Sequence, residues 1–166
     1  AKENEKIQAA KQALENSSSS SAFISSAQLL ADADEVWKAY AKAGLITDHE
    51  TGDTGNNYSF SQCTWWVYIR RHQLGLTAGS LMGNGNQWAN TARSLGYSVS
   101  NTPMVGDVMV FAAGQEGSDG YYGHVAIVEG ITTDGSVITS ECGASRNGQP
   151  YSRVISNPSR FEYIHY

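Results

Sequence analysis

The chain has 166 residues, a formal net charge of −5 and 40% hydrophobic residues, enough for one core of ordinary size. It has no basic cluster, which argues against nucleic acid as a partner, and its longest apolar run is too short to span a membrane. Two cysteines and four histidines without CxxC or HxxxH spacing exclude a disulfide scaffold and argue against a structural zinc site.

The composition changes near residue 50. All five lysines lie at or before Lys42, all six arginines lie at or after Arg70, and sixteen of the seventeen glycines follow residue 51. This change predicts a helical segment at 1–50 and a main domain at 51–166.

The first segment is expected to form two helices joined by a serine-rich turn at 17–21. Three apolar residues before the turn recur at helical spacing: Ile7, Ala10 and Leu14. The second helix is expected to start from a capping box at 25–28 and to end at Gly44. The two helices either pack on the main domain or form the end of a longer coiled coil. They carry no reactive residues, which favours a helical spacer without chemistry of its own. A protein partner that binds these helices stays an open alternative.

Two more helices and four strands are expected after residue 50. The helices span 63–74 and 88–95, and Gly75 and Gly96 follow them as stop signals. The strands are short stretches rich in β-branched or aromatic residues, at 107–112, 123–131, 135–142 and 159–165. Helices followed by antiparallel strands predict an α+β fold.

Cys63 is the candidate nucleophile. It lies where a Gly/Asn-rich loop gives way to the helical pattern, and the unpaired N–H groups and dipole of a helix start stabilise an anion. The alternative is burial as a small apolar residue, as for many free cysteines. The polar pair Ser61-Gln62 ahead of Cys63 favours the nucleophile.

His124 is the candidate base. It begins a β-rich stretch after a Gly-rich loop, and a Cys early with a His late is the arrangement that a thiol hydrolase needs. His72 lies on the same helix as Cys63, on the opposite side and about 13 Å along the axis, so it is not the partner. His49 and His165 are expected at the surface.

Glu141 is the candidate orienting acid. An Asp-Gly pair within 133–136 predicts a two-residue type I′ turn, which would place Val128 opposite Glu141. Because side chains alternate, Glu141 would then share a face with His124, while Cys142 would point away and form no disulfide with Cys63. The alternative for Glu141 is a solvated carboxylate at a strand end.

Several motifs together resemble the CHAP family, the cysteine, histidine-dependent amidohydrolases/peptidases. The resemblance covers about 56–166 and is carried by Gln62-Cys63-Thr64-Trp65-Trp66, Asn86-Gln87-Trp88-Ala89, Asn101-Thr102-Pro103 with Val105-Gly106-Asp107, Gly123-His124-Val125-Ala126 and Tyr163-Ile164-His165. It implies a papain-like core with helices packed beside an antiparallel sheet. It also implies hydrolysis of amide bonds in bacterial peptidoglycan, outside the cytoplasm, by a secreted or cell-wall-associated enzyme.

The resemblance also assigns roles. Cys63 would be the nucleophile, His124 the base and Glu141 the orienting acid, and Gln62 is similar to the residue that helps to form the oxyanion hole. Many relatives carry Asn where this chain has Gly143. This departure leaves any fourth catalytic group open.

Two aromatic residues are candidates for gripping the substrate. Tyr122 lies just before His124, and Trp88 starts the second of the two later helices; core packing is the alternative, above all for Trp88. The acidic stretch 48–53 lacks EF-hand spacing, so a solvated linker is favoured over a calcium site, and no metal or cofactor is expected.

The reaction class leaves three functions open. The favoured one is a peptidoglycan amidase or endopeptidase acting through a thioacyl intermediate. A catalytically weak wall-binding or scaffolding module is the alternative that Gly143 keeps open. A transglutaminase-like acyl transferase is the third, although nothing in the sequence specifies a site for an amine.

Overall fold

The computed structural model describes residues 29–166. The first expected helix, the serine-rich turn at 17–21 and the capping box at 25–28 lie outside the described residues. Within residues 29–166, no helix has the length and apolar character needed to cross a membrane.

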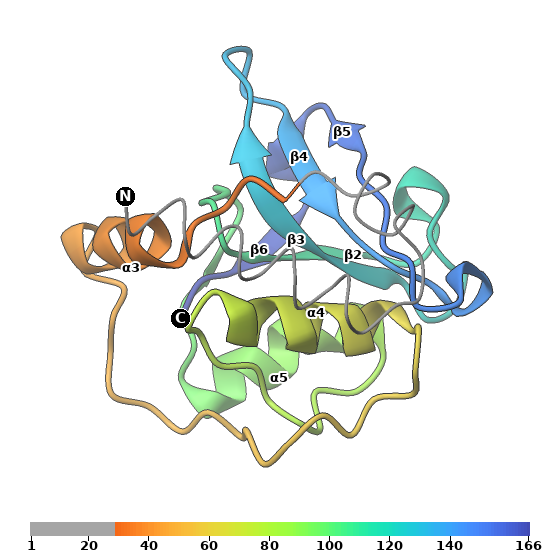
Figure 1. Ribbon diagram of the computed structural model, residues 1–166, viewed down its shortest axis with the longest axis horizontal. Helices are drawn as coiled ribbons and strands as arrows, with labels where there is room; N and C mark the ends of the chain where they lie inside the picture. Colours follow the sequence, from red (N-terminus) through yellow and green to blue (C-terminus); the bar gives the residue numbers. More distant parts are fainter. Residues whose placement is uncertain (1–28) are drawn as a thin grey trace.

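An antiparallel sheet forms the centre of the fold (Figure 1). In the described residues it has six strands, in the order β1-β6-β2-β3-β4-β5. The strands are β1 (Val99–Ser100), β2 (Val108–Phe111), β3 (His124–Ile131), β4 (Val137–Ser140), β5 (Val154–Ile155) and β6 (Glu162–Ile164). The four predicted strands correspond to β2, β3, β4 and β6, whereas β1 and β5 were not predicted.

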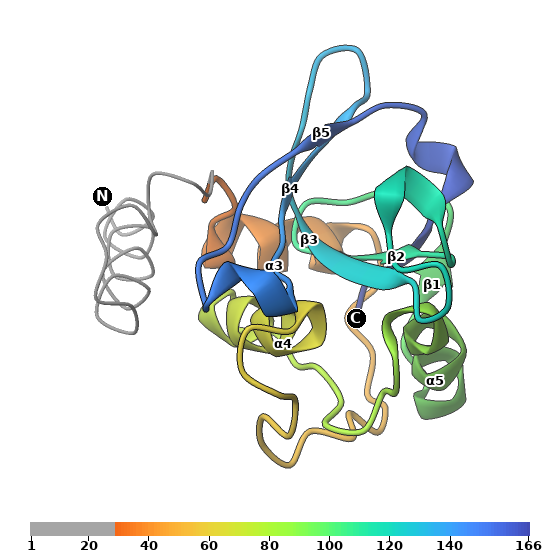
Figure 2. The ribbon, with the colours of Figure 1, turned by 90° about the vertical axis from the view of Figure 1, so that its right-hand side faces the viewer.

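Three α-helices accompany the sheet in the described part of the chain. α4 (Cys63–Gln73) and α5 (Trp88–Leu95) lie along one side of the sheet, and α3 (Ala33–Lys42) lies beside it (Figures 1 and 2). Four 3₁₀ turns occur in the loops: η1 (Gly85–Gln87), η2 (Gln115–Gly117), η3 (Ala144–Arg146) and η4 (Pro158–Arg160). The predicted α+β fold is confirmed.

Glycines and one aspartate set the helix ends. α4 and α5 match the predicted helices, and Gly75 and Gly96, which follow them, have φ of +73° and +96°. Gly44 likewise follows α3, with φ of +73°. The expected start of this helix at 25–28 is wrong, since residues 29–32 are not helical and α3 begins at Ala33. There the Asp32 carboxylate accepts hydrogen bonds from two backbone N–H groups of the first turn, at 3.0 and 3.2 Å.

The two largest apolar clusters of the described residues lie on opposite faces of the sheet. The helix-side cluster includes Val36 and Tyr40 of α3, Val67 of α4, Trp88 of α5, and Val125 and Ile127 of β3. The second cluster is built from β2, β3, β4, β5 and the end of the chain: Met109, Phe111, Ala126, Val128, Val137, Ile155, Phe161 and Tyr163. Because α3 contributes to the first cluster, it packs on the main domain rather than extending away from it.

The β3–β4 hairpin differs from the predicted register. The loop has three residues, since the N–H of Thr132 donates to the carbonyl of Ser136 at 2.9 Å, and Gly135 takes φ of +87°. The predicted two-residue turn is therefore wrong. A bulge at Glu129 then shifts the pairing again, so that Val128 faces Thr139.

The prediction that His165 lies at the surface is wrong. Its side chain is 5% exposed, and its Nδ1 lies 2.8 Å from the carboxylate of Asp107. Tyr40 donates to the same carboxylate oxygen at 2.6 Å, and Arg71 donates to the His165 carbonyl at 2.9 Å. His165 thus belongs to a buried polar network that ties the end of the chain to α3 and α4.

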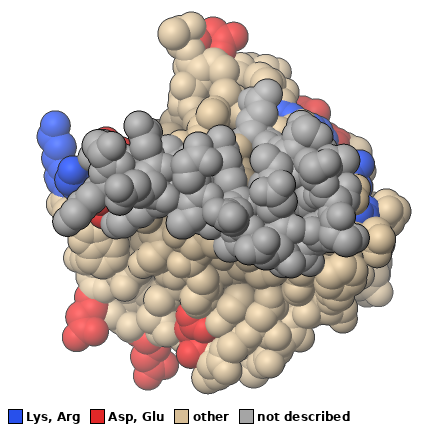
Figure 3. All heavy atoms as spheres, in the orientation of Figure 1, with Lys and Arg blue, Asp and Glu red and all other residues tan. Residues whose placement is uncertain are grey.

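Charged side chains are unevenly placed on the visible surface. Figure 3 shows, outside the grey atoms, acidic side chains along the lower edge and at the top, basic side chains at the left, and both kinds at the upper right. The described surface between them on this face is largely without charge.

Candidate active site

A cleft of about 660 Å³ lies where the start of α4 meets the start of β3. Its walls come from four stretches that are far apart in the sequence: 57–64, 83–85, 116–124 and 142–153. Cys63, His124 and Gln62 all line it. The fold therefore brings three of the residues singled out from the sequence into one cavity.

Cys63 is the first residue of α4, as the sequence predicted, and Gln62 is the N-cap. Among the described residues the Gln62 side chain makes no capping hydrogen bond, so it does not occupy the N–H groups of the first turn. Those donors and the positive end of the helix lie at the thiol. They favour negative charge at this point of the cleft.

Ser61 anchors the turn that leads into α4. It is 1% exposed and takes φ of +72°, a conformation that is strained for a residue other than glycine. Its hydroxyl donates to the carbonyl of Gly143 at 2.7 Å and accepts from the N–H of Gly148 at 2.9 Å. The loop before the nucleophile is thereby fixed to the segment that follows Glu141.

His124 begins β3, with its side chain 13% exposed. Its Nε2 lies 2.8 Å from Oε1 of Glu141. Burial would lower the pKa of His124, but hydrogen bonds to Cys63 and Glu141 and the charges of both raise it to about 9. The imidazole is therefore stabilised in its protonated form between a thiol and a carboxylate.

Glu141 has no exposed surface. Burial would raise its pKa, but hydrogen bonds from His124, Arg153 and Thr139, together with the charge of His124, lower the pKa to about 2. The group is a carboxylate at neutral pH and can only accept, so Nε2 of His124 carries a proton. That leaves Nδ1 as the nitrogen available to Cys63.

The structure places Glu141 on the face of His124 by a route that differs from the predicted one. The three-residue turn shifts the pairing of β3 with β4 by one residue from the prediction, and the bulge at Glu129 shifts it by one more. The two shifts together return Glu141 to the predicted face of the sheet. Cys142 consequently points to the other side, where it clusters with Leu29 and Trp66. Both cysteines are free thiols.

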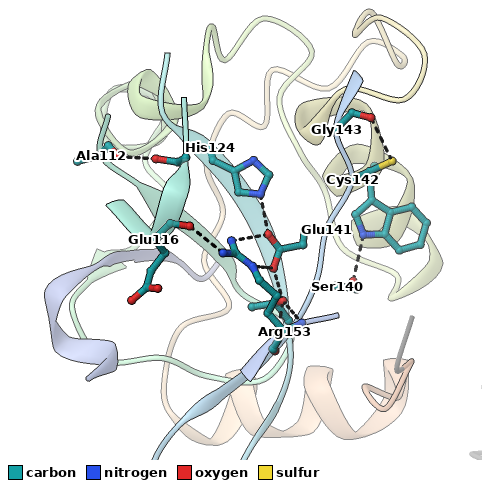
Figure 4. A network of polar contacts seen from close by, with 11 residues as sticks. Ala112, Glu116, His124, Ser140, Glu141, Cys142, Gly143 and Arg153 are labelled. Atoms are coloured by element: carbon teal, nitrogen blue, oxygen red, sulfur yellow. Dashed lines mark hydrogen bonds and ion pairs between the residues drawn. The ribbon is translucent and has the colours of Figure 1, made fainter. Parts of the chain in front are cut away.

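Arg153 is the member of the site that the sequence analysis missed. Its Nη2 donates to Oε1 of Glu141 at 2.7 Å and its Nε donates to Oε2 at 3.0 Å, while Nη1 donates to the carbonyl of Glu116 at 2.8 Å (Figure 4). Arg153 precedes β5, which pairs with β4. No local pattern in the sequence marks this pairing, so nothing near Arg153 pointed to the site.

Gly143 occupies the position where many relatives carry Asn. Its φ of −165° is open to any residue, and nothing lies within 4 Å of where a Cβ would be. Gly143 itself lines the cleft. The space that an Asn side chain would need is therefore present.

The two aromatic candidates lie in different places. Tyr122 lines the cleft and is 50% exposed. Trp88 is fully buried in the helix-side cluster, where its Nε1–H donates to the Gly83 carbonyl at 3.1 Å. Trp88 therefore packs in the core, which was the alternative to a role in binding substrate. Its ring is not exposed to a ligand.

The acidic stretch 48–53 is partly occupied by protein contacts. The Asp53 carboxylate accepts from the Tyr68 hydroxyl and lies 2.6 Å from Nε2 of His72. Residues 29–166 contain no group of three or more His, Cys, Asp or Glu side chains arranged to hold a metal ion. The contacts of Asp53 fix the stretch before the cleft to α4.

The arrangement suits attack of a thiolate on a carbonyl carbon. A thiol at a helix start supplies the nucleophile, an imidazole between the thiol and a carboxylate moves the proton, and uncapped N–H groups can stabilise an oxyanion. One cavity therefore holds a thiol at a helix start and an imidazole paired with a buried carboxylate.

Comparison with known proteins places this site in a family. A family model for the CHAP domain matches residues 53–143. The probable autolysin LDP of Staphylococcus aureus (strain NCTC 8325 / PS 47) is 40% identical over 111 residues, which cover 67% of this chain and 38% of that protein. Staphylococcal secretory antigen SsaA of the same strain is 42% identical over 113 residues, covering 66% of this chain and 41% of that protein.

A solved structure is similar over a comparable range. The crystal structure of N-acetylmuramoyl-L-alanine amidase from Staphylococcus aureus matches with a TM-score of 0.64 and 36% sequence identity, covering 73% of this chain and 33% of that chain. The chain thus spans less than half the length of these relatives.

Proposed function

Because the chain belongs to the CHAP domain family, we propose that it is a peptidoglycan hydrolase that cleaves an amide bond of the cell-wall peptide through a cysteine nucleophile. The observation that carries this proposal is the cleft that Cys63 and His124 both line, in which Nε2 of His124 lies 2.8 Å from the Glu141 carboxylate. Similarity to an autolysin and an amidase supports the choice of substrate.

Activation of the thiol is the first step. Nδ1 of neutral His124 takes the proton of Cys63, and the raised pKa of His124 favours the resulting pair of thiolate and imidazolium. Glu141 accepts from Nε2–H, so it holds the ring in the tautomer that leaves Nδ1 free and stabilises the positive charge that develops.

Attack and breakdown complete the reaction. The thiolate adds to the amide carbonyl, and the backbone N–H of Cys63, with Gln62 as second donor, stabilises the oxyanion. One such donor is worth about 2.7–4 kcal/mol in other hydrolases. The imidazolium of His124 then gives its proton to the leaving amine, and the C–N bond breaks to leave a thioester on Cys63. Water hydrolyses the thioester, with His124 again as base, and releases the acid.

The substrate lies outside the cytoplasm, so the protein is proposed to act in the cell wall or after secretion. Tyr122 offers a half-exposed ring in the cleft for stacking on a sugar or peptide stem. Two bonds fit the chemistry: the amide between muramic acid and L-alanine, and an amide within the stem or cross-bridge.

The test compares wild type, Cys63→Ser and Cys142→Ala on purified cell walls. Loss of Cys63 is expected to abolish release of soluble fragments. Cys142→Ala removes the other thiol, which points away from His124, and is expected to retain activity once folding has been checked by thermal melting. Mass spectrometry of the fragments identifies the bond. Unchanged lysis by folded Cys63→Ser would rule out the mechanism, and no lysis by wild type would rule out the substrate.

A further inference from the structure

We propose that Arg153 is a positioning residue that holds Glu141 in the orientation and charge state that His124 requires. The inference rests on the proposed function only for the roles of Cys63 and His124. Arg153 lies beyond residues 53–143, the range that matches the family.

The geometry of the contact is the first argument. Arg153 grips both oxygens of Glu141 through Nη2 and Nε, at 2.7 and 3.0 Å. A bidentate guanidinium–carboxylate pair fixes the plane of the carboxylate, which a single hydrogen bond does not. Oε1 therefore cannot rotate away from Nε2 of His124, which it meets at 2.8 Å.

The charge of the contact is the second argument. Glu141 has no exposed surface, and a lone carboxylate at such a depth is strongly disfavoured. His124 alone is a variable partner, because it gains and loses a proton during the reaction. Arg153 stays charged throughout, so it keeps Glu141 ionised when the imidazole is neutral.

A third N–H group of Arg153 reaches the rim of the cleft. Nη1 donates to the carbonyl of Glu116 at 2.8 Å, in a segment that lines the cavity together with Tyr122. Glu116 is held in turn by an ion pair between its carboxylate and Arg160, at 2.7 Å. Arg153 thus connects the acid to the rim of the cleft.

A direct role in binding substrate is the competing explanation, since Arg153 lines the cleft and its side chain is 30% exposed. Its Nε, Nη1 and Nη2 already donate to protein acceptors. Only two of its five N–H groups are left for a substrate carboxylate. The structure therefore favours an action through Glu141.

The test is a double-mutant cycle read by the reactivity of Cys63. Arg153→Met, Glu141→Gln and the double variant are prepared in a Cys142→Ala background, which leaves one thiol. The rate of alkylation by iodoacetamide is measured between about pH 4 and 9. Arg153→Met is expected to slow alkylation near neutral pH by about tenfold or more, as loss of a group that orients a catalytic residue does elsewhere. In the Glu141→Gln background the same change is expected to alter the rate less than about twofold.

Equal slowing in both backgrounds would overturn the proposal, because Arg153 would then act without Glu141. If Arg153→Met does not fold, the comparison uses Arg153→Lys, which keeps the charge and loses the fork. Arg153→Lys is expected to slow alkylation several-fold where Glu141 is present and to leave the rate unchanged in the Glu141→Gln background. The double variant carries no buried charge at either position.

Arg146→Met is the matched control. Arg146 lies over the Tyr151 ring and donates from Nε to the carbonyl of Gln149 rather than to Glu141, so its loss is expected to leave alkylation unchanged. A large effect of Arg146→Met would show that any nearby arginine matters, and would overturn the specific role.

Turnover on cell walls separates the remaining explanation. A positioning role predicts lower kcat with little change in KM, whereas substrate binding by Arg153 predicts higher KM with kcat retained. Alkylation needs no substrate. If wild type fails to release wall fragments while the cycle behaves as expected, the proposed function falls and the role of Arg153 stands.

Discussion

Acid unfolding should reveal the charge that Glu141 carries inside the fold. Burial opposes ionisation of this side chain, but hydrogen bonds from His124 and Arg153 lower its pKa from an ordinary value of 4.5 to about 2. A carboxylate whose pKa is lower in the folded state stabilises the fold above the unfolded pKa, and that contribution is lost as pH falls through the folded pKa. The fall from 4.5 to about 2 is worth about 3 kcal/mol, and the Glu141→Gln variant should lack it.

The assay is urea unfolding of wild type and Glu141→Gln over a pH series. The variant cannot ionise at this position, so the difference between the two free energies of unfolding isolates Glu141 from the other carboxylates. This difference should be constant above about pH 5 and should shrink by about 3 kcal/mol as the pH falls to about 2. A difference that does not change with pH would refute the reasoning, because it would mean that the pKa of Glu141 is the same in the folded and the unfolded protein.

Four further outcomes follow from the contacts. Because the pKa of His124 is raised from 6.5 to about 9, its stabilising contribution should be complete below 6.5 and disappear as pH rises through about 9, and His124→Gln should lack this loss in the same urea series. Ser61→Ala should lower the free energy of unfolding by about 1–3 kcal/mol, since it leaves two buried backbone groups without their partner. Gly143→Asn should change stability by less than about 0.5 kcal/mol in thermal melts, because the backbone is extended and the space is open. Trp88→Ala should cost about 3–5 kcal/mol of stability, whereas Tyr122→Ala should leave melting unchanged and raise KM.

Local patterns were sufficient for the longer elements. The helical repeat and the glycine stops predicted α4 and α5, including the start of α4 at Cys63. The β-rich stretches predicted β2 and β3. β1 and β5 are two residues long, and two residues carry no period to recognise.

Pairing between distant strands explains two contacts that the sequence did not predict. Arg153 meets Glu141 because the chain after β4 returns beside it, with Tyr151 bridged to Glu141. His165 was placed at the surface from its position near the end of the chain, yet the pairing of β6 with β1 and β2 carries it inward to Asp107. Both contacts depend on the order of strands in the sheet, which composition and spacing do not give.

The bulge at Glu129 decides which side chain faces His124. The three-residue turn alone would place Glu141 opposite Ile127, on the helix side, and would turn Cys142 toward the imidazole. One extra residue in β3 reverses this.

Glu129, the residue at the bulge, has a buried carboxylate that binds α4 and the backbone at the start of the described chain. The Glu129 carboxylate pairs with Arg70 of α4 at 2.8 Å and accepts from the backbone N–H groups of Leu30 and Ala31, both at 3.1 Å. Arg70 also donates to the Ala31 carbonyl at 2.9 Å. Both members of the buried ion pair therefore bind the backbone at residues 30–31. Removal of one partner of such a buried pair would leave the other charge uncompensated in the interior. Residues 30–31 lie before the range that matches the family, yet their backbone binds the side chain of the residue at the bulge, and that bulge sets the register that brings Glu141 to His124.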